Sequence, residues 1–370
     1  MSVYVDHTHL GRAVTGLERI TLELFSAAAL APLDVAPVTA RGTAAMIMTQ
    51  TFGLPTLLAR ARSALMLCPG FPPSPLLLPF GERVIPYVHD LFLLTRRHDL
   101  NARAKLYMAE PFRLAVRRLP RFLVNSEDTR GKLAALCRPD AQILLYRPRV
   151  RNVFGLRADA RPLRSPQPQH LRFVALGTVE PRKNYPAAAA LARALAVRHD
   201  RRVTLDIIGR QGWGDDWLRL SASLDVVLHG YQTTAQAAAL IDAADAFICT
   251  SYEEGLGLPL LEAQYAGLPI IAPDQPVFRE VLGASGLYID PRDPARAADA
   301  VERCFARAGW RHRHATLATQ NLRRWNTHAA ADRDAVVDAI DRLVQSRAGG
   351  VPALRTATSR YGGDAGRRAG

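Results

Sequence analysis

The sequence predicts an α/β protein with two domains, of which the second is built on a doubly wound parallel sheet. The chain has 370 residues, which is more than one hydrophobic core usually organises. From residue 171 onward, short apolar runs alternate with helical segments, and this alternation is typical of parallel sheets. Several of the runs end in glycine, at the sheet edge where doubly wound folds bind their ligands.

The first domain is expected over residues 1–165, where three short apolar runs predict buried strands. Asn125 and Ser126 follow the third run and are suited to cap a helix whose first residues are acidic, as the helix dipole favours. Residues 31–80 contain many prolines and little alternation, so they predict mixed strand and loop. The three expected strands are 3–5, 83–88 and 121–124.

The second domain is expected over residues 170–315, because the polar, proline-rich segment 162–170 marks a boundary. Thr233 and Gln236 predict a capping box at the start of one helix. Pro259 and Gly267 are typical of the first position of another helix and of its stop. The expected strands are 171–177, 203–209, 226–230 and 246–250, and the expected helices are about 186–198, 234–243 and 258–267.

A long amphipathic helix is expected at 316–345, with Trp325 packed against the core. The triplet of Asp332, Arg333 and Asp334 lies in this helix and is interpreted as a solvated face rather than a metal site. Residues 346–370 are rich in glycine, alanine and arginine and nearly lack large apolar side chains, so a disordered basic tail is expected.

The chain is basic, with 48 lysines and arginines against 34 acidic residues and a net charge of +14. Residues 102–164 hold 15 basic and five acidic side chains, an excess of ten. Such a region is suited to phosphorylated ligands or to an anionic membrane surface, and the alternative is a set of solvated arginines. Nucleic acid is not expected as a partner, because the sequence has no zinc-finger, helix-turn-helix or basic-aromatic signature.

The cysteines and the hydropathy pattern bear on location. The four cysteines lie far apart and form neither a disulfide framework nor a zinc pattern. No apolar run reaches the roughly 20 residues that cross a bilayer, and the first residues do not form a signal peptide. A cytoplasmic protein is therefore expected, with peripheral binding at the inner face of the cytoplasmic membrane as a further option.

The stretch SYEEGLGLPLLE at 251–262 carries the strongest chemical signal. Gly255 and Gly257 let the backbone approach a ligand closely, and free N–H groups at the start of the following helix favour phosphate. Because a carboxylate repels phosphate, Glu254 and Glu262 are expected to accept hydrogen bonds from neutral hydroxyls such as those of sugars. The pattern indicates a ligand with hydroxyl-bearing groups on both sides of a diphosphate.

The pattern E-G-x-G-L-P-x-x-E, followed by A-x-x-x-G-x-P-I-I-A, resembles the signature of family 4 retaining glycosyltransferases with the GT-B fold. The resemblance includes the E-x7-E spacing of Glu254 and Glu262. It implies two Rossmann-like doubly wound parallel-sheet domains facing a cleft, the first receiving the acceptor and the second the nucleotide sugar, with a C-terminal helix crossing back to the first domain. Further matching segments are GTVEPRKN at 177–184, residues 229–251 and 273–283, and more weakly TGLERI at 15–20, YVHDLF at 87–92 and VNSEDTRGKL at 124–133.

The resemblance implies roles for residues of the second domain. Glu262 is expected to hold the ribose hydroxyls, and Glu254 to contact the sugar and diphosphate together with the amides of Gly255, Leu256, Gly257 and Leu258. Lys183 matches the family's basic residue on the diphosphate. Family members often have an arginine directly after the glycine at Gly177, where this chain has Thr178, and Arg182 is expected to supply that charge.

Other positions match more weakly. His89 resembles the first-domain histidine that contacts the transferred sugar, which makes it a catalytic candidate beside Glu254, Lys183 and Arg182. Gly16 resembles a glycine that faces the diphosphate, and the backbone near Tyr231 resembles the segment that reads the base. Gly209 ends a strand at the same sheet edge and is counted among the donor-binding candidates.

The chemistry of glycosyl transfer agrees with these residue types. Breaking a glycosyl–phosphate bond builds negative charge on the leaving diphosphate, which cations and backbone amides stabilise. No metal and no cofactor are expected, and the resemblance implies retention of the anomeric configuration. The expected donor is a nucleotide diphosphate sugar, GDP-mannose first and a UDP-sugar second. The expected acceptor is a glycan or a lipid-linked acceptor in surface polysaccharide or lipopolysaccharide biosynthesis.

Two alternatives remain open. The chain could be a catalytically silent relative that serves as a binding protein, for which the threonine at 178 is the only hint. It could also be another nucleotide-sugar enzyme of the same architecture. A dehydrogenase is disfavoured, because no G-x-G-x-x-G follows any expected strand.

Overall fold

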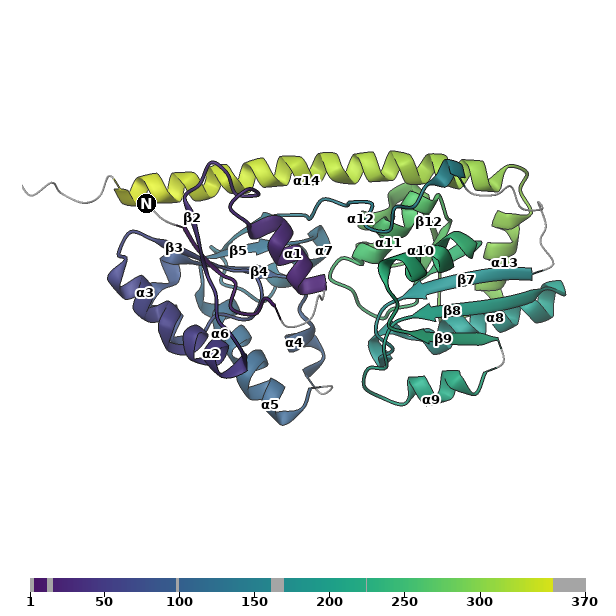
Figure 1. Ribbon diagram of the computed structural model, residues 1–370, viewed down its shortest axis with the longest axis horizontal. Coiled ribbons are helices and arrows are strands. Elements are labelled where there is room, and N and C mark those ends of the chain that lie inside the picture. The colour runs from purple at the N-terminus through teal and green to yellow at the C-terminus, as the bar shows by residue number, and fades with distance from the viewer. Residues whose placement is uncertain (1–2, 12–15, 98–99, 161–169, 224, 349–370) are drawn as a thin grey trace, which may run out of the picture.

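The computed structural model describes residues 3–11, 16–97, 100–160, 170–223 and 225–348. Two parallel sheets lie side by side, each with helices packed around it, and one long helix runs along both (Figure 1). The expected fold class is confirmed: two Rossmann-like halves are joined by a C-terminal helix that reaches back to the first.

The first sheet has six strands in the order β2-β1-β3-β4-β5-β6, and each neighbouring pair is parallel. Strands β3 and β4 are buried at every position, as expected for central strands covered on both faces. The strands are β1 (Val3–Asp6), β2 (Val35–Val38), β3 (Leu65–Cys68), β4 (Val84–Val88), β5 (Arg121–Val124) and β6 (Gln142–Leu145).

Short helical elements connect these strands, and several are irregular. Their bounds are α1 (Gly16–Phe25), α2 (Thr43–Met48), η1 (Thr49–Gly53), α3 (Leu54–Arg60), η2 (Pro75–Arg83), α4 (Phe92–Thr95), α5 (Ala102–Ala104), η4 (Lys105–Ala109), α6 (Glu110–Arg118), α7 (Glu127–Ala134) and η5 (Ala158–Ala160). Segment 31–80, expected to be strand and loop, contains two strands and also the helices from α2 to η2.

The second sheet has six strands in the order β12-β11-β10-β7-β8-β9, again all parallel. The order reverses at β7 and β10, which makes their carboxyl ends the topological switch point. The strands are β7 (His170–Leu176), β8 (Arg202–Ile208), β9 (Val226–Gly230), β10 (Ala246–Ile248), β11 (Ile270–Pro273) and β12 (Gly286–Ile289).

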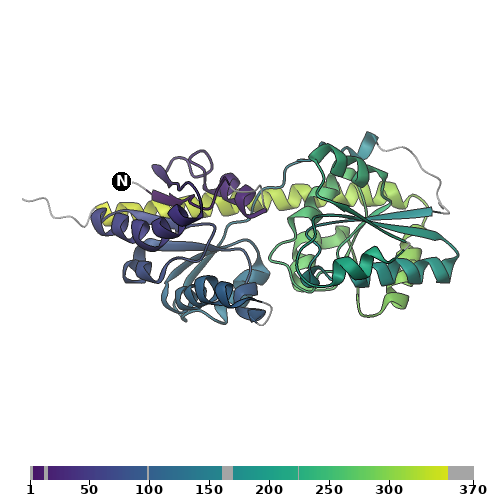
Figure 2. The same ribbon diagram turned by 60° about the horizontal axis from the view of Figure 1, so that its bottom comes forward.

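Helices cover the second sheet on both faces (Figure 2). The expected capping box is confirmed, since the Thr233 and Gln236 side chains bond each other's backbone N–H groups. Gly267 ends its helical segment in the left-handed region, with φ 68°, as its position predicts. The elements are η6 (Pro181–Lys183), α8 (Tyr185–His199), α9 (Asp216–Ser221), α10 (Thr234–Ala243), α11 (Leu258–Ala263), η7 (Gln264–Ala266), α12 (Pro276–Leu282), η8 (Gly283–Ser285), α13 (Pro294–Phe305) and α14 (Trp310–Ala348).

Helix α14 has 39 residues and ties the two halves together (Figure 1). Trp325 is fully buried, as expected, and its indole N–H donates to the Pro148 carbonyl at 2.9 Å. Toward the second sheet, Asn321 donates to Gln264 at 2.8 Å. Toward the first, Arg333 donates to the Ala29 carbonyl at 2.9 Å. One apolar cluster therefore continues from the first sheet through α14 into the second.

Two expectations about single residues are wrong. Asp332 is not a solvated carboxylate: its side chain is 14% exposed and binds the Arg147 guanidinium at 2.8 Å, because α14 packs against the segment that follows β6. Asn125 does not cap α7; Ser126 does, accepting from the Thr129 N–H at 3.1 Å. The Asn125 amide donates instead to the His89 carbonyl at 2.7 Å.

Two further findings concern the C-terminal segment and the search for membrane-spanning helices. The expected tail begins inside α14, which extends to Ala348, and residues 349–370 lie outside the described ranges. Within those ranges, no helix combines the length and apolar character needed to span a membrane.

Candidate functional site

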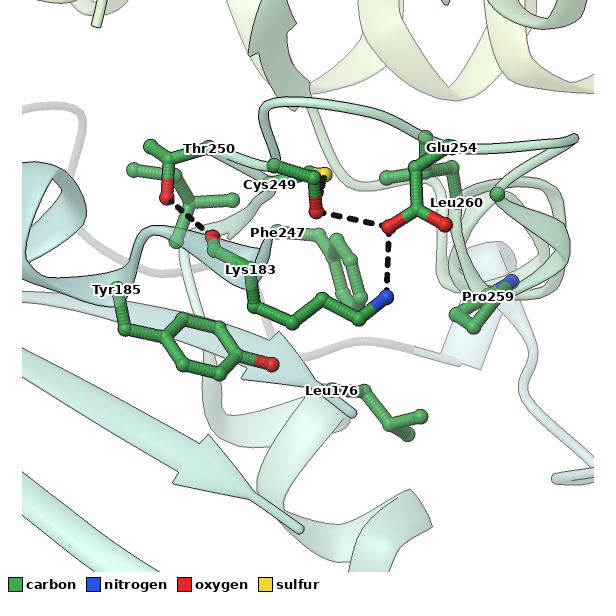
Figure 3. A pocket seen from close by; sticks show the side chains of 12 residues that line it. Leu176, Lys183, Tyr185, Phe247, Cys249, Thr250, Glu254, Pro259 and Leu260 are labelled. Atoms are coloured by element: carbon green, nitrogen blue, oxygen red, sulfur yellow. Dashed lines mark hydrogen bonds and ion pairs between the residues drawn. The ribbon is translucent and has the colours of Figure 1, made fainter. Parts of the chain in front are cut away.

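The glycine-rich loop after β10 lies at the switch point of the second sheet, beside the loop that follows β7 (Figure 3). The Thr250 hydroxyl fixes the two loops together by donating to the Asn184 carbonyl at 2.8 Å. Gly257, directly before α11, has φ 77°, a conformation that favours glycine. The alternation of strands and glycines thus places the SYEEGLG segment at the ligand-binding edge.

Glu254 is the centre of a polar cluster in this loop. Lys183 Nζ lies 2.6 Å from one carboxylate oxygen (Figure 3). The Ser251 hydroxyl donates to the same oxygen at 2.7 Å. Arg182 Nη1 donates to the other oxygen at 3.1 Å. Although burial opposes ionisation, the charges of Lys183 and Arg182 lower the pKa of Glu254 to about 2. Glu254 is therefore a carboxylate at every physiological pH.

Arg182 has the position expected for a substitute cation. Its guanidinium bridges Glu254 and Glu180, donating to Glu180 at 2.8 Å and 3.1 Å. Thr178 lies in the same loop, and its methyl group packs so closely on Gly212 that a Cβ there would lie 2.7 Å away. The two cations and two carboxylates of the cluster balance in formal charge.

The strand-end glycines serve close packing between neighbouring loops. A Cβ on Gly209 would lie 2.0 Å from the Gly177 carbonyl oxygen, and one on Gly177 would lie 3.2 Å from the Lys183 side chain. The Tyr185 hydroxyl donates to the same Gly177 carbonyl at 3.1 Å. Gly177 and Gly209 therefore bring the β7 and β8 loops together behind Lys183.

The backbone amides of the loop are the second feature of the site. Within the described ranges, no hydrogen-bond acceptor is found for the N–H groups of residues 255–258, since the contacts of this segment involve its carbonyl groups and side chains. The side chains of Leu256 and Leu258 are buried, at 4% and 7% exposure. Consecutive unpaired N–H groups at a helix start are suited to an anion.

Glu262 lies on α11 and faces the first domain. Its carboxylate forms an ion pair with Arg19 of α1, and its side chain is 4% exposed. Burial raises the pKa of Glu262 to about 7, although the Arg19 charge opposes the rise. The second carboxylate of the motif is thus a group that changes charge near neutral pH, and its partner comes from the other half of the chain.

His89 follows β4 on the first-domain side. Its Nε2–H donates to the Pro69 carbonyl at 2.7 Å, and burial lowers the pKa of its imidazole. The ring is therefore neutral at physiological pH. It borders a cavity of about 240 Å³ whose walls are mainly apolar. Sequence reasoning missed these walls, which include Phe71, Pro72, Phe92, Leu93, Met108 and Phe112.

The two halves meet at this point. A Cβ on Gly255 would lie 1.9 Å from the His89 carbonyl oxygen, so the structure brings the glycine-rich loop after β10 and the predicted histidine into direct contact. The structure also adds Arg19, Ser126 and Glu280 to the site, a role that the sequence did not predict for them. Their partners at the site are distant in the chain, so no local pattern indicated these contacts.

Two weaker expectations remain predictions. Gly16 is exposed at the first position of α1, and a Cβ there would meet nothing within 4 Å. Residues 12–15, which precede it, lie outside the described ranges. Tyr231 follows β9 and is 80% exposed, at the same sheet edge as Lys183 but without a recorded role in the cluster.

The family model for glycosyl transferases group 1 matches residues 170–307. The serotype-specific mannosyltransferase WbdA of Escherichia coli is 34% identical over 158 residues, 41% of this chain and 19% of that protein. O-antigen chain mannosyltransferase B of Escherichia coli is 34% identical over 123 residues, 32% of each chain. The chain thus spans about a fifth to a third of the length of these curated relatives.

Solved structures match over nearly the whole chain. Sucrose-phosphate synthase from Thermosynechococcus elongatus has a TM-score of 0.65 at 15% identity, covering 93% of this chain and 99% of that one. WaaG, a glycosyltransferase involved in lipopolysaccharide biosynthesis, has a TM-score of 0.60 at 14% identity, covering 92% and 99%. The chain therefore has the GT-B fold, and its second domain matches the family model for glycosyl transferases group 1.

Proposed function

We propose that this protein is a retaining hexosyltransferase that moves a sugar from a nucleotide diphosphate sugar to a hydroxyl of a glycan or lipid-linked acceptor. The observation that carries this proposal is the loop at the switch point of the second sheet. There, Lys183, Arg182 and four unpaired amides converge beside Glu254. Cations and N–H groups suit the diphosphate, and carboxylates suit sugar hydroxyls.

Mannose is our first choice for the transferred sugar, and GDP-mannose for the donor. Two relatives that are 34% identical over part of this chain are a serotype-specific mannosyltransferase and an O-antigen chain mannosyltransferase, which supports this choice. A UDP-sugar is the second choice. We place the ribose on Glu262, which requires the Arg19 ion pair to open, and the base near Gly209 and Tyr231.

The proposed reaction needs no protein nucleophile. The anomeric carbon breaks its bond to the diphosphate oxygen and forms a bond to the acceptor oxygen on the same face, while the acceptor proton passes to the leaving phosphate oxygen. Glu254 is suited to hold sugar hydroxyls, because three donors fix its carboxylate. Lys183, Arg182 and the amides of 255–258 stabilise the charge that develops on the diphosphate. Because the Nε2–H of neutral His89 donates to the Pro69 carbonyl, its Nδ1 is left to accept a hydrogen bond from a sugar hydroxyl. We propose that no metal takes part.

The acceptor is proposed to approach from the first domain. The apolar cavity beside His89 suits an acceptor with a hydrophobic part. The first domain also exposes Leu106 and Tyr107, at 64% and 62%, next to Lys105 in its basic region. Apolar and cationic side chains together suit an anionic membrane surface, so we propose peripheral binding there for a cytoplasmic enzyme acting in surface polysaccharide biosynthesis.

The test is a donor screen followed by a transfer assay. A ligand that binds only the native state raises the melting temperature, so GDP-, UDP- and dTDP-sugars are compared by thermal shift. The stabilising donor is then incubated with mannosylated acceptors, and product is measured by mass spectrometry with and without a chelator. Stabilisation by a donor without any turnover identifies a silent relative. Loss of activity with chelator that magnesium restores contradicts the metal-free reaction.

Glu262→Gln is the first variant to compare, because it keeps the shape of the side chain and removes its charge. Nucleotide affinity and turnover are expected to fall together, since the ribose loses a charged acceptor. Unchanged affinity and turnover contradict the assignment of ribose to Glu262. Asp334→Asn, at a side chain that is 70% exposed, is the matched control and is expected to behave as the wild type.

A further inference from the structure

The carbonyl group of Gly255 is held by side chains of the opposite domain. The Ser126 hydroxyl lies 2.8 Å from the Gly255 oxygen, and the Thr129 hydroxyl lies 3.3 Å from it. A carbonyl oxygen only accepts, so the hydroxyls donate. Ser126 and Thr129 are 0% and 2% exposed. These hydrogen bonds join the start of α7, in the first domain, to the middle of the proposed diphosphate loop.

This contact fixes the direction of a backbone amide. The peptide between Gly255 and Leu256 is trans, and in a trans peptide the C=O and the N–H point in opposite directions. With its carbonyl oxygen held toward Ser126, the peptide presents the Leu256 N–H away from the first domain. Within the described ranges this N–H has no acceptor.

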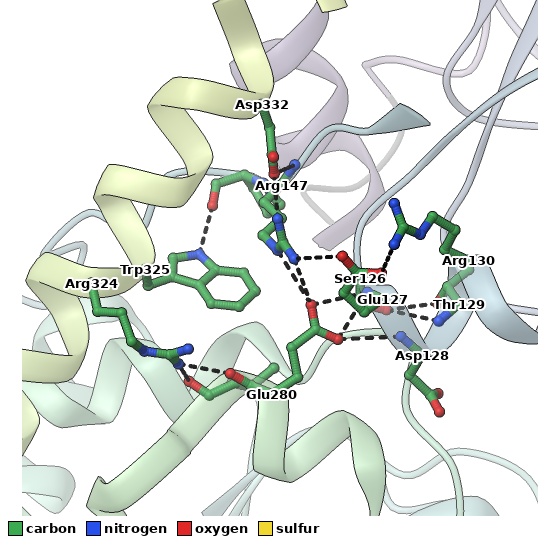
Figure 4. A network of polar contacts seen from close by, with 12 residues as sticks. Ser126, Glu127, Asp128, Thr129, Arg130, Arg147, Glu280, Arg324, Trp325 and Asp332 are labelled. Atoms are coloured by element: carbon green, nitrogen blue, oxygen red, sulfur yellow. Dashed lines mark hydrogen bonds and ion pairs between the residues drawn. The ribbon is translucent and has the colours of Figure 1, made fainter. Parts of the chain in front are cut away.

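A second set of contacts holds the start of α7 in place, from which Ser126 and Thr129 reach the Gly255 carbonyl. The Glu280 carboxylate, from α12 of the second domain, accepts from the N–H of Glu127 at 2.8 Å and of Asp128 at 3.2 Å (Figure 4). Arg147 donates to Glu280 at 3.0 Å and to Asp332 at 2.8 Å. An acidic group at a helix N-terminus is stabilising, so α7 is capped from across the domain boundary.

The Gly255 peptide is packed closely against the first domain. A Cβ on Gly255 would lie 1.9 Å from the His89 carbonyl oxygen, and the Asn125 amide donates to that same oxygen at 2.7 Å. The backbone of His89, the start of α7 and the Gly255 peptide are thus packed as one unit. This unit is complete only when both domains are in contact.

We propose that Ser126 and Thr129 are positioning residues, whose hydroxyls hold the Gly255–Leu256 peptide from the first domain so that the Leu256 N–H faces the diphosphate of the donor. The inference depends on the function proposed above for this loop. Lys183, Glu262 and the loop itself all belong to the second domain, so the donor can dock there first. Contact with the first domain then fixes the Gly255–Leu256 peptide and completes the set of hydrogen-bond donors around the leaving diphosphate.

The test compares variants of the two hydroxyls. The double variant Ser126→Ala with Thr129→Val removes both donors, and the pair Ser126→Thr with Thr129→Ser retains both. Lys132→Gly is the matched stability control, because it weakens α7 at an exposed position whose one ion pair within the described residues is with Asp128. All variants are compared with the wild type at temperatures equally far below their melting points.

Steady-state kinetics with the donor found by the screen give the main readout. The double variant is expected to lose at least tenfold in kcat, with less than a threefold change in donor KM, because the hydroxyls act after the donor has docked. The conservative pair is expected to restore kcat, and Lys132→Gly to keep it. Equal kcat in the double variant and Lys132→Gly overturns the inference, as does a raised KM with unchanged kcat.

Hydrogen exchange provides a readout that does not need turnover. With nucleoside diphosphate present, peptides covering residues 252–260 are expected to exchange faster in the double variant than in the wild type, and no faster in Lys132→Gly. Equal exchange in all three overturns the inference. If the wild type turns over no sugar donor, the proposed function fails, and this exchange measurement still decides whether the hydroxyls fix the loop.

Discussion

Replacing Glu262 by glutamine should change how the stability of the protein depends on pH. Glu262 is 4% exposed, and its pKa in the folded chain is raised from 4.5 to about 7. A raised carboxyl pKa means that folding favours the neutral form, so the benefit is complete below about pH 4.5 and is lost as the pH rises through 7. Glutamine does not titrate and escapes this loss.

The magnitude follows from the pKa shift. A shift of about 2.5 units, at about 1.36 kcal/mol per unit, corresponds to about 3 kcal/mol for the whole transition. Most of this loss of stability occurs between about pH 5 and pH 8. The free energy of unfolding of Glu262→Gln relative to the wild type is therefore expected to rise by about 2 to 3 kcal/mol over this interval.

Urea unfolding of both proteins, followed by circular dichroism at several pH values, measures this difference. Loss of the Arg19 ion pair in the variant adds an offset, so only the change of the difference with pH is diagnostic. Arg19→Met provides a second arm: its charge lowers the pKa of Glu262, so removing it should steepen the loss of stability with pH. A difference between Glu262→Gln and the wild type that stays constant from pH 5 to pH 8 refutes the reasoning.

Three further predictions concern the site and the helix that joins the domains. Gly255→Ala is expected to abolish transfer while the second domain still binds nucleotide, because its Cβ would lie 1.9 Å from the His89 carbonyl oxygen; calorimetry and a transfer assay measure the two, and full turnover would contradict the contact. Lys183→Met is expected to weaken nucleoside diphosphate binding by about tenfold to a hundredfold, or about 1.4 to 2.7 kcal/mol, whereas Lys183→Arg keeps a cation and should lose less; equal affinities would remove Lys183 from the diphosphate. Trp325→Ala is expected to cost about 3 to 5 kcal/mol of stability, because the side chain is fully buried and bonded to Pro148; thermal unfolding tests this, with Trp325→Phe as the milder control.

The second domain was predictable because its signals are local. Each of its four predicted strands is an apolar run that ends in glycine or a small polar residue, and Thr233 and Gln236 specify a helix start within four residues. Strands β11 and β12 were not predicted. The loop with Glu254 and Glu262 likewise carries its residue types at fixed spacing. Segment 31–80 was not predictable in the same way, because its helices are short and include 3-10 and π-type turns, which have no α-helical periodicity.

The contacts between the domains were not predictable from sequence patterns. Arg19 and Glu262 are 243 positions apart, and Glu280 lies 153 positions beyond the α7 amide that it binds. Asp332 shows the same limit, since an aspartate on an amphipathic helix was expected to be solvated and is instead bound to Arg147. Local sequence indicates which chemistry a loop can support, whereas the folded chain decides which partners complete it.

The division of α14 between the two domains has a consequence for building chimeric proteins. The match to the group 1 family ends at residue 307, but a graft cut there would leave the buried Gln264 and the Val281 carbonyl without Asn321, which binds both. From Asp332 onward, the same helix binds the first domain through Arg147, Ala29 and Glu82. A transplant of donor specificity should therefore place its junction inside the helix, between Trp325 and Asp332, so that each half of α14 stays with the sheet it has evolved to cover.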